Sequence, residues 1–432
     1  MSQRIVLGVW LILVCCLGGI IGCGQKQTVD TNKITIWHWM TDRDDAFKAI
    51  AKQYKDKTGI TVEFLNYAPS DSYKVKVNAA AQTNTLPDIF GVLDTKEVYA
   101  KFINSDHILD LTSEMDADDR LWKNRFFRRA LASNIFEEGN SYKVKQGIYG
   151  VPLDVTNIQM LYNKRLFKQA GLDPEKPPLT WDEFIQAYQK LKGVGVRGMV
   201  SGWGEGWMID CFANNYAFNI MGEQKVLDTY RGLVPYTDPD WLKVFGLFDE
   251  LRREKMLLSD VVTMVNKNAE QSFALERAAF AFNGSWCVNV YKGMNPNLEY
   301  GAMLPPRRSD AFPMKIWGGP GSSFMVNAKS PNKDKAVAFL KWITAKDQQA
   351  FLAQSTNNLP SDKESLKSIS PILAQFADDM DITTHPSVWP LDEKPKVKEA
   401  FNKGVQSIII GEKTPERVAA DVQRIKERED LK

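Results

Sequence analysis

The segment from Lys33 to Leu93 alternates between strand-like and helix-like stretches, and this order limits the possible folds more than any other feature. Short apolar runs predict strands over 33–37, 60–65 and 88–93. Amphipathic stretches between them predict two helices, the first ending at Gly59 and the second covering 70–83. Strand, helix, strand, helix, strand is the order of an α/β protein with a largely parallel sheet.

Four side chains that end or follow these expected strands define a candidate binding rim. They are His38, Trp39, Tyr67 and Asp94. Ligands of open parallel sheets collect at the carboxyl ends of the strands, so the four are expected at one edge of the sheet. A carboxylate such as Asp94 can accept two hydrogen bonds, and an aromatic ring can cover an apolar ligand face.

The stretch 150–191 predicts a strand, a short helix and a longer helix. Residues 158–162 are an apolar run of strand length, and the next helix should end at Gly171, a residue type that often ends helices. Thr180 and Glu183 have the spacing of a capping box for the longer helix. No catalytic group follows from this pattern.

The N-terminus has the layout of a secretory signal. Arg4 precedes an apolar run over 5–21, which ends at Gly22-Cys23. The run approaches the length that spans a bilayer, so a transmembrane anchor is the alternative. Cys23 follows a small residue, as in the bacterial lipobox that this segment resembles. We therefore expect a signal peptide over 1–22, a lipid-modified Cys23 and a polar tether over 23–32.

Composition argues against several classes of partner. Lys and Arg number 55 against 53 Asp and Glu, and a net charge of +2 argues against nucleic acid or a polybasic membrane patch. The histidines and cysteines lack metal-ligand spacing, so we expect no metal and no cofactor. Cys211 and Cys287 are interpreted as unpaired core residues, although a disulfide between them stays open.

The motifs of common enzymes are missing from the sequence. Gly193-Val-Gly-Val-Arg-Gly198 has dinucleotide-fingerprint spacing, but it follows an expected helix and precedes an expected strand, the wrong order for a phosphate loop. There is no Walker sequence and no Gly-x-Ser-x-Gly elbow. Acidic residues are plentiful, so a glycosidase pair stays open, yet nothing points to one. We expect a binding protein and not an enzyme.

Tryptophans beside glycines supply further candidate contacts. Trp203 and Trp207 alternate with glycines over 200–210, which suits a loop whose indoles meet a flat ligand; a core position is the equal alternative for each. Residues 268–281 are expected to be helical and to lead into Asn283-Gly-Ser-Trp286.

Several motifs occur in the order typical of the family 1 extracellular solute-binding proteins, the sugar-capturing subunits of ABC importers. The chain resembles this family at Tyr149-Gly-Val-Pro152, Tyr162-Asn-Lys164, Ala170-Gly-Leu172, Thr180-Trp-Asp-Glu-Phe184, Asn283-Gly-Ser-Trp286 and Asn358-Leu-Pro360. In that family the tryptophan of Asn-Gly-x-Trp stacks on bound sugar, which is the role implied for Trp286. Maltose-binding proteins place another sugar-stacking tryptophan at the position of Trp389.

The resemblance implies a two-lobed α/β fold of the type II periplasmic binding proteins, with a mixed sheet flanked by helices in each lobe and the ligand in a cleft between the lobes. The first lobe would comprise 33–150 and 318–357, and the second lobe 151–317 and 358–432. The substrate-binding residues expected from motif and position together are Trp286, Trp389, Asp94, Trp39, His38, Trp203, Trp207, Trp317, Asn283 and Tyr67.

The implied function is capture of a mono- or oligosaccharide for the permease subunits of an ABC importer. The protein would be a monomer, anchored by its lipid on the extracytoplasmic side of the cell membrane. One alternative keeps the fold but exchanges the sugar for a polyamine, a phosphodiester or iron. The other alternative is a secreted glycosidase.

Overall fold

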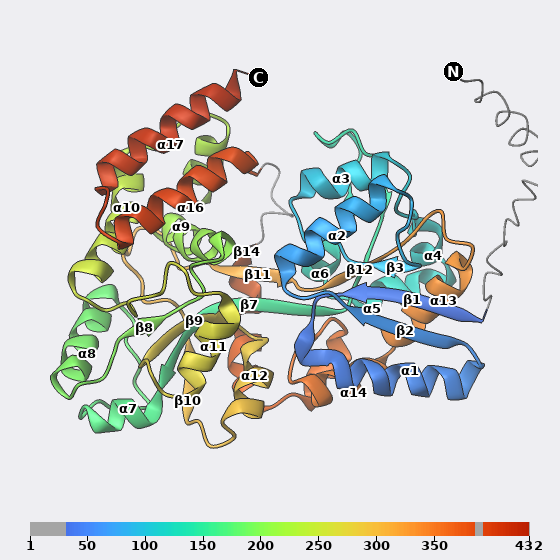
Figure 1. Ribbon diagram of the computed structural model, residues 1–432, viewed down its shortest axis with the longest axis horizontal. Helices are drawn as coiled ribbons and strands as arrows, with labels where there is room; N and C mark the ends of the chain where they lie inside the picture. The colour runs from blue at the N-terminus through green and yellow to red at the C-terminus, as the bar shows by residue number, and fades with distance from the viewer. Residues whose placement is uncertain (1–31, 385–391, 432) are drawn as a thin grey trace, which may run out of the picture.

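The computed structural model describes residues 32–384 and 392–431 and shows two lobes side by side, each built around its own sheet (Figure 1). The expected signal segment, Cys23 and Trp389 lie outside the described residues. Within them, one sheet has five strands in the order β2-β1-β3-β12-β6, and the other has seven. The strands β4 (Ile135–Phe136) and β5 (Gly147–Ile148) form a separate antiparallel pair.

The five-stranded sheet is mixed. β1 pairs in parallel with β2 and β3, whereas β12 runs antiparallel to β3 and β6. Its strands are β1 (Lys33–His38), β2 (Thr61–Asn66), β3 (Ile89–Phe90), β6 (Val151–Pro152) and β12 (Ser323–Val326). The accompanying helices are α1 (Asp44–Thr58), α2 (Ser70–Gln82), α3 (Lys96–Asn104), α4 (Thr112–Asp116), α5 (Leu121–Arg125), α6 (Arg128–Ala132), α13 (Lys333–Ile343) and α14 (Lys346–Thr356).

Side chains alternate between the two faces of this sheet because successive residues of a strand point in opposite directions. Ile34 and Ile36 of β1 pack in a core with the apolar faces of α1 and α13. Phe90 of β3 and Met325 of β12 pack in a second core with α2 and α3. The sheet is therefore covered by helices on both faces.

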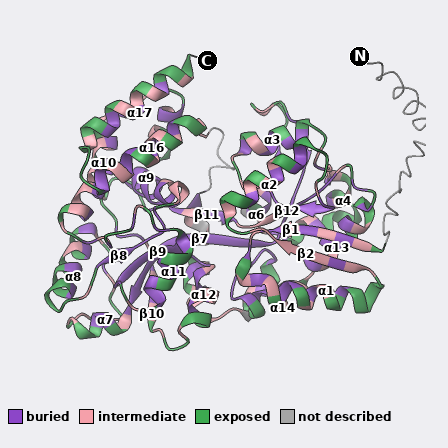
Figure 2. Cartoon of the chain, viewed as in Figure 1, coloured by how far each residue is buried: buried purple, intermediate pink, exposed green. Residues whose placement is uncertain are grey.

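The second sheet is centred on β7 (Asp154–Asn163), a strand in which every residue is buried. β7 pairs with β9, β10, β11 and β13, while β8 and β14 lie at the edges. The partner strands are β8 (Met199–Val200), β9 (Phe280–Gly284), β10 (Tyr300–Met303), β11 (Ile316–Pro320), β13 (Leu359–Pro360) and β14 (Thr383–Thr384). Figure 2 shows the resulting band of buried residues through this lobe.

The helices of the second lobe pack against this sheet or against one another. They are α7 (Lys164–Gln169), α8 (Trp181–Gly193), α9 (Gly206–Tyr230), α10 (Pro239–Arg253), α11 (Asn266–Ala274), α12 (Cys287–Met294), α15 (Pro371–Asp378), α16 (Pro395–Ile409) and α17 (Pro415–Asp430). Of these helices, α10, α16 and α17 pack against α9 and one another. The core contains Phe212 of α9, Phe248 of α10 and Phe401 of α16. None of the helices in the described part of the chain has the length and apolar character needed to cross a membrane.

Backbone segments join the two sheets where β7 begins. Leu153 lies between β6 and β7, and its N donates to Ser322 O (2.8 Å) in the turn between β11 and β12. Gly321 N donates to Asp154 O (3.1 Å), and a Cβ at Gly321 would lie 2.1 Å from Asp154 Oδ1, so a larger residue would push the segments apart. The lobe boundaries expected from the sequence, at 150/151, 317/318 and 357/358, stay a proposal.

Several local predictions are confirmed. The capping box joins Thr180 and Glu183 at the start of α8. Gly171 has a φ of +70° just after α7, a conformation that glycine adopts without strain. Cys211 and Cys287 are free and buried.

Two local predictions are wrong. The helix expected over 268–281 ends with α11 at Ala274, and 280–284 is the strand β9. Alanine-rich sequence favours a helix, but pairing of β9 with β7 and β8 decides the conformation here. The loop expected over 200–210 ends early, because α9 begins at Gly206 and includes Trp207.

Candidate functional site

Trp207 and Trp286 form a partly exposed aromatic pair in the second lobe. Trp286 stands between β9 and α12, and Trp207 lies in the first turn of α9. Their ring centroids are 5.9 Å apart, and the ring planes are inclined by 50°. Neither residue is fully buried, so the pair leaves indole surface for a ligand.

The turn before Trp286 fixes where its indole lies. A Cβ at position 284 would lie 2.0 Å from the ring of Trp286, so Gly284 leaves the room that the ring occupies. Asn283 is buried, and its Oδ1 accepts a hydrogen bond from Gly284 N (2.8 Å). Trp286 Nε1 donates to Glu270 Oε1 on α11 (3.0 Å).

The first lobe meets this region through η1 (Thr41–Arg43), the turn that follows β1. Asn289 of α12 lies one helical turn after Trp286, and its Nδ2 donates to Asp42 O (2.9 Å). Asn358 Nδ2 donates to Asp42 Oδ2 (3.4 Å). The carboxylate of Asp42 and the amides of Asn289 and Asn358 thus lie beside the segment that carries Trp286. Carboxylates and amides can bind hydroxyl groups.

Arg43 and Asp154 form a buried ion pair next to this contact. Arg43 Nη2 contacts Asp154 Oδ2, and Asp154 Oδ1 accepts a hydrogen bond from Ser322 N (2.5 Å). Burial raises the pKa of Asp154, and the positive charge of Arg43 opposes that rise. The pair ties the turn after β1 to the start of β7, where the sheets meet.

The strand-end residues of the first lobe lie in different surroundings. Trp39 is partly exposed and packs on Tyr73, with ring centroids 5.0 Å apart. Tyr67 is also partly exposed, and Lys76 Nζ lies 4.2 Å from its ring centroid. Asp94 is exposed, and its Oδ1 accepts a hydrogen bond from Thr95 N (2.8 Å). These three side chains are available to solvent.

His38 has the environment of a structural residue. Its side chain is 1% exposed and lies edge-on to Phe47 and Phe64, at centroid distances of 5.0 and 5.9 Å. Burial is the largest influence on the imidazole and lowers its pKa to about 4. The ring is therefore neutral at pH 7, and its Nδ1 accepts a hydrogen bond from Met40 N (3.3 Å).

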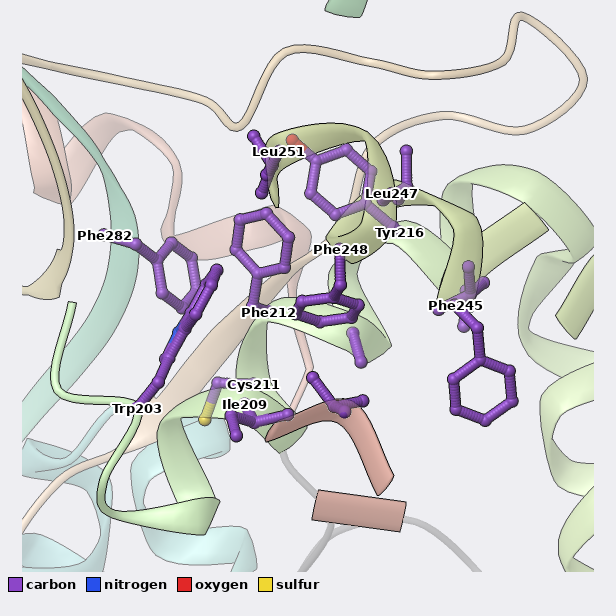
Figure 3. Packing of buried hydrophobic residues seen from close by; sticks show 14 of the residues in the cluster. Trp203, Ile209, Cys211, Phe212, Tyr216, Phe245, Leu247, Phe248, Leu251 and Phe282 are labelled. Atoms are coloured by element: carbon purple, nitrogen blue, oxygen red, sulfur yellow. The ribbon is translucent and has the colours of Figure 1, made fainter. Parts of the chain in front are cut away.

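Trp203 lies in the core of the second lobe (Figure 3). It is 0% exposed, and its ring centroid is 5.3 Å from that of Phe212 and 5.4 Å from that of Phe248. In this structure a ligand cannot touch it. Trp317 on β11 differs, because it is partly exposed; its backbone N donates to Asn215 Oδ1 (2.7 Å).

Asp42, Asn289 and Glu270 were missed by the sequence reasoning. Asp42 follows the first strand closely, so the strand-end rule that selected His38 and Trp39 could also have selected it. Asn289 and Glu270 carry no local signal, since their relation to Trp286 and Asp42 depends on how α11 and α12 pack. One small cavity lies beside the Arg43–Asp154 pair and is also lined by Asn358, and another lies around Asp210 and Lys398 in the second lobe.

Within the described residues, no group of three or more His, Cys, Asp and Glu side chains is arranged to hold a metal ion. The region gathers indole faces, a carboxylate and side-chain amides, which are groups that can bind a ligand non-covalently. Two lobes, each with its own sheet, that meet beside groups suited to ligand binding are typical of the two-lobed solute-binding proteins.

Residues 49–384 match the family model described as bacterial extracellular solute-binding protein. The match covers most of the chain, and the chain belongs to this family. Members of the family act outside the cytoplasm, and this protein is therefore extracytoplasmic.

Several similar proteins are named for the sugars that they bind, and others, such as UgpB of Escherichia coli, for sn-glycerol 3-phosphate. The melibiose/raffinose/stachyose-binding protein MelE of Bacillus subtilis is 24% identical over 380 residues, covering 85% of this chain and 82% of that protein. The multiple sugar-binding protein of Streptococcus mutans is 27% identical over 213 residues, about half of each chain (48% and 49%). The solved structure of a chitin oligosaccharide binding protein matches 93% of this chain and 99% of that one, with 22% identity and a TM-score of 0.77. That likeness supports the two-lobed fold.

Proposed function

We propose that this protein is the substrate-binding subunit of an ABC importer and captures a mono- or oligosaccharide between its lobes. The observation that carries the proposal is the partly exposed Trp207–Trp286 pair, which lies next to the contact between Asp42 of one lobe and Asn289 of the other. A sugar ring has apolar C–H faces and a rim of hydroxyls. Indoles cover the faces, while carboxylates and amides bind the hydroxyls.

The proposed ligand site combines residues of both lobes. Trp286 and Trp207 supply the stacking surface, and Trp317 extends it. Trp39, Tyr67 and Asp94 supply the first lobe's side, and Trp389 joins them because of the sequence resemblance.

Asn283 supports the site from below the surface, because its side chain holds the turn before Trp286. We assign His38 and Trp203 to the cores, because each is almost fully buried.

Delivery to a membrane permease follows from the same proposal. Lobes joined by a few backbone segments can close by rotation about those segments and enclose a ligand. We propose the lobe boundaries given above for this motion, with the monomer as the active form. The names of relatives such as MelE support a sugar ligand, whereas that of UgpB keeps a phosphate ester as the alternative.

A sugar should raise the melting temperature of the purified protein. A ligand that binds only the folded state adds about 2.7 kcal/mol to the free energy of unfolding at a hundred times its Kd. We expect at least one member of a panel of maltose, raffinose, chitobiose and xylobiose to shift the thermal transition, with saturation in calorimetry.

Parallel samples with spermidine, glycerophosphocholine and ferric citrate test a polyamine, a phosphodiester and iron as ligands. Mass spectrometry of the incubated sugars tests for hydrolysis. A shift by a non-sugar solute alone would contradict the sugar proposal, and cleavage of the oligosaccharide would contradict a purely binding role.

We also propose that Cys23 is lipid-modified and holds the protein at the outer side of the cell membrane. The motive is the apolar run that ends in Ile-Ile-Gly-Cys. Cys23→Ser should release the protein from membranes into the medium or periplasm, as measured by fractionation and immunoblot. Membrane retention of the variant with an uncut N-terminus would favour a transmembrane anchor instead.

A further inference from the structure

We propose that Glu270 is a positioning residue for the ligand site, one that fixes the indole of Trp286 through a charge-assisted hydrogen bond. The consequence for binding rests on the sugar-binding function proposed above, whereas the consequence for the indole does not. Glu270 lies on α11, and its side chain contacts the indole of Trp286. Because Glu270 is 0% exposed, it cannot touch a ligand and acts only through the tryptophan.

Two hydrogen bonds converge on one oxygen of Glu270. Its Oε1 accepts from Trp286 Nε1 (3.0 Å) and from Asn266 Nδ2 (2.9 Å). Lys267 Nζ lies 3.1 Å from Oε2 and forms an ion pair with that oxygen. The carboxylate thus contacts the indole of Trp286 and two residues in the first turn of its own helix, Asn266 and Lys267.

A carboxylate is a costly residue for this position. Burial raises the pKa of Glu270, the charge of Lys267 lowers it, and the charge of Asp42 in the first lobe raises it. An apolar side chain would fill a buried site without a desolvation cost. Packing therefore does not explain the carboxylate, whereas its polar contacts with Trp286, Asn266 and Lys267 do.

The same segment also holds the turn that leads to Trp207. Asn266 N donates to Glu205 Oε2 (2.6 Å), and Gly204 N donates to Met264 O (2.9 Å). The segment 264–270 therefore contacts the turn before Trp207 through Asn266 and Met264, and the indole of Trp286 through Glu270.

The charge of Glu270 also changes the indole as a binding surface. A hydrogen bond to an ionised acceptor is about twice as strong as a neutral one. An indole whose N–H donates to a carboxylate carries more negative charge on its ring face, and that face attracts the C–H groups of a ligand. Glutamine can accept the same hydrogen bond without the charge, and leucine cannot accept it.

The first test needs no ligand. The indole N–H resonance of Trp286 is assigned in protein labelled with 15N by its loss in Trp286→Phe. Because a carboxylate acceptor deshields this proton, we expect an upfield shift in Glu270→Gln and a larger one in Glu270→Leu. Glu393→Gln is the matched control: Glu393 is buried and paired with Lys426 and Tyr236 elsewhere in the second lobe. It should lower the melting temperature and leave the Trp286 resonance in place.

The second test measures binding of raffinose and chitobiose by calorimetry. Glu270→Leu should weaken binding about tenfold, equivalent to about 1.4 kcal/mol, whereas Glu270→Gln should retain most of the affinity. An unchanged indole resonance in folded Glu270→Gln, or wild-type affinity in folded Glu270→Leu, would overturn the proposal. If neither raffinose nor chitobiose binds the wild type, the indole resonance alone decides the role of Glu270, and the sugar-binding function then depends on maltose and xylobiose.

Discussion

Trp286→Ala should abolish sugar binding or weaken it severely. The side chain is partly exposed next to the contact between the lobes, and truncation removes both its stacking face and half of the aromatic pair with Trp207. Buried aromatic contacts at binding sites typically contribute about 2 kcal/mol or more, which corresponds to roughly a thirtyfold rise in Kd. Calorimetry with the best sugar of the panel measures the change.

The stability of ligand-free Trp286→Ala gives the control. Trp286 packs against apolar residues of two cores and donates to Glu270, so some loss of melting temperature is expected. That loss should be smaller than the about 3–5 kcal/mol typical of a fully buried tryptophan. Trp286→Phe keeps an aromatic face and should retain part of the affinity. A Trp286→Ala variant that is strongly destabilised yet binds sugar normally would place Trp286 in the core.

Elements whose signals are local were predictable from the sequence. The capping box of Thr180 and Glu183 uses atoms of one helical turn, and Gly171 ends α7 through its own backbone conformation. The strand over 158–162 was predicted from its apolar run, and the observed β7 is longer because it also includes the polar residues Asp154, Thr156 and Asn157. The α/β class followed from the order of such elements.

Elements decided by distant partners were not predictable in the same way. Residues 280–281 form part of β9 because they pair with Tyr162 and Leu161 of β7, and that pairing overrides the helical preference of an alanine-rich run. The motif at Asn283-Gly-Ser-Trp286 was recognised by resemblance. The hydrogen bond from Trp286 to Glu270 was not, since it joins residues on α11 and after β9.

The glycine-flanked tryptophans show the limit most clearly for the site. Trp203 and Trp207 have similar neighbours in the sequence, and the pattern gave each an equal chance of lying in the core or at the surface. The structure separates them: Trp203 is enclosed by Phe212 and Phe248, and Trp207 faces Trp286. Trp207 follows Trp203 by four residues and lies in the first turn of α9. Its indole is partly exposed, whereas that of Trp203 is buried.

Trp203→Ala should therefore have the opposite effect to Trp286→Ala. We expect a loss of about 3–5 kcal/mol in the free energy of unfolding, because a fully buried indole leaves a cavity that the neighbouring rings fill only in part. Denaturant titration of the ligand-free protein measures this loss. Folded Trp203→Ala should bind the same sugar with nearly wild-type affinity, since no part of the side chain is exposed.

Trp203→Phe separates packing from hydrogen bonding at this position. Trp203 Nε1 has no hydrogen-bond partner among the described residues, so its removal costs no hydrogen bond and only part of the packing. The phenylalanine variant should accordingly lose much less stability than the alanine variant. If Trp203→Ala instead kept its stability and lost sugar binding, Trp203 would belong to the ligand site, and the core that joins α9 and α10 would have to rearrange when sugar binds.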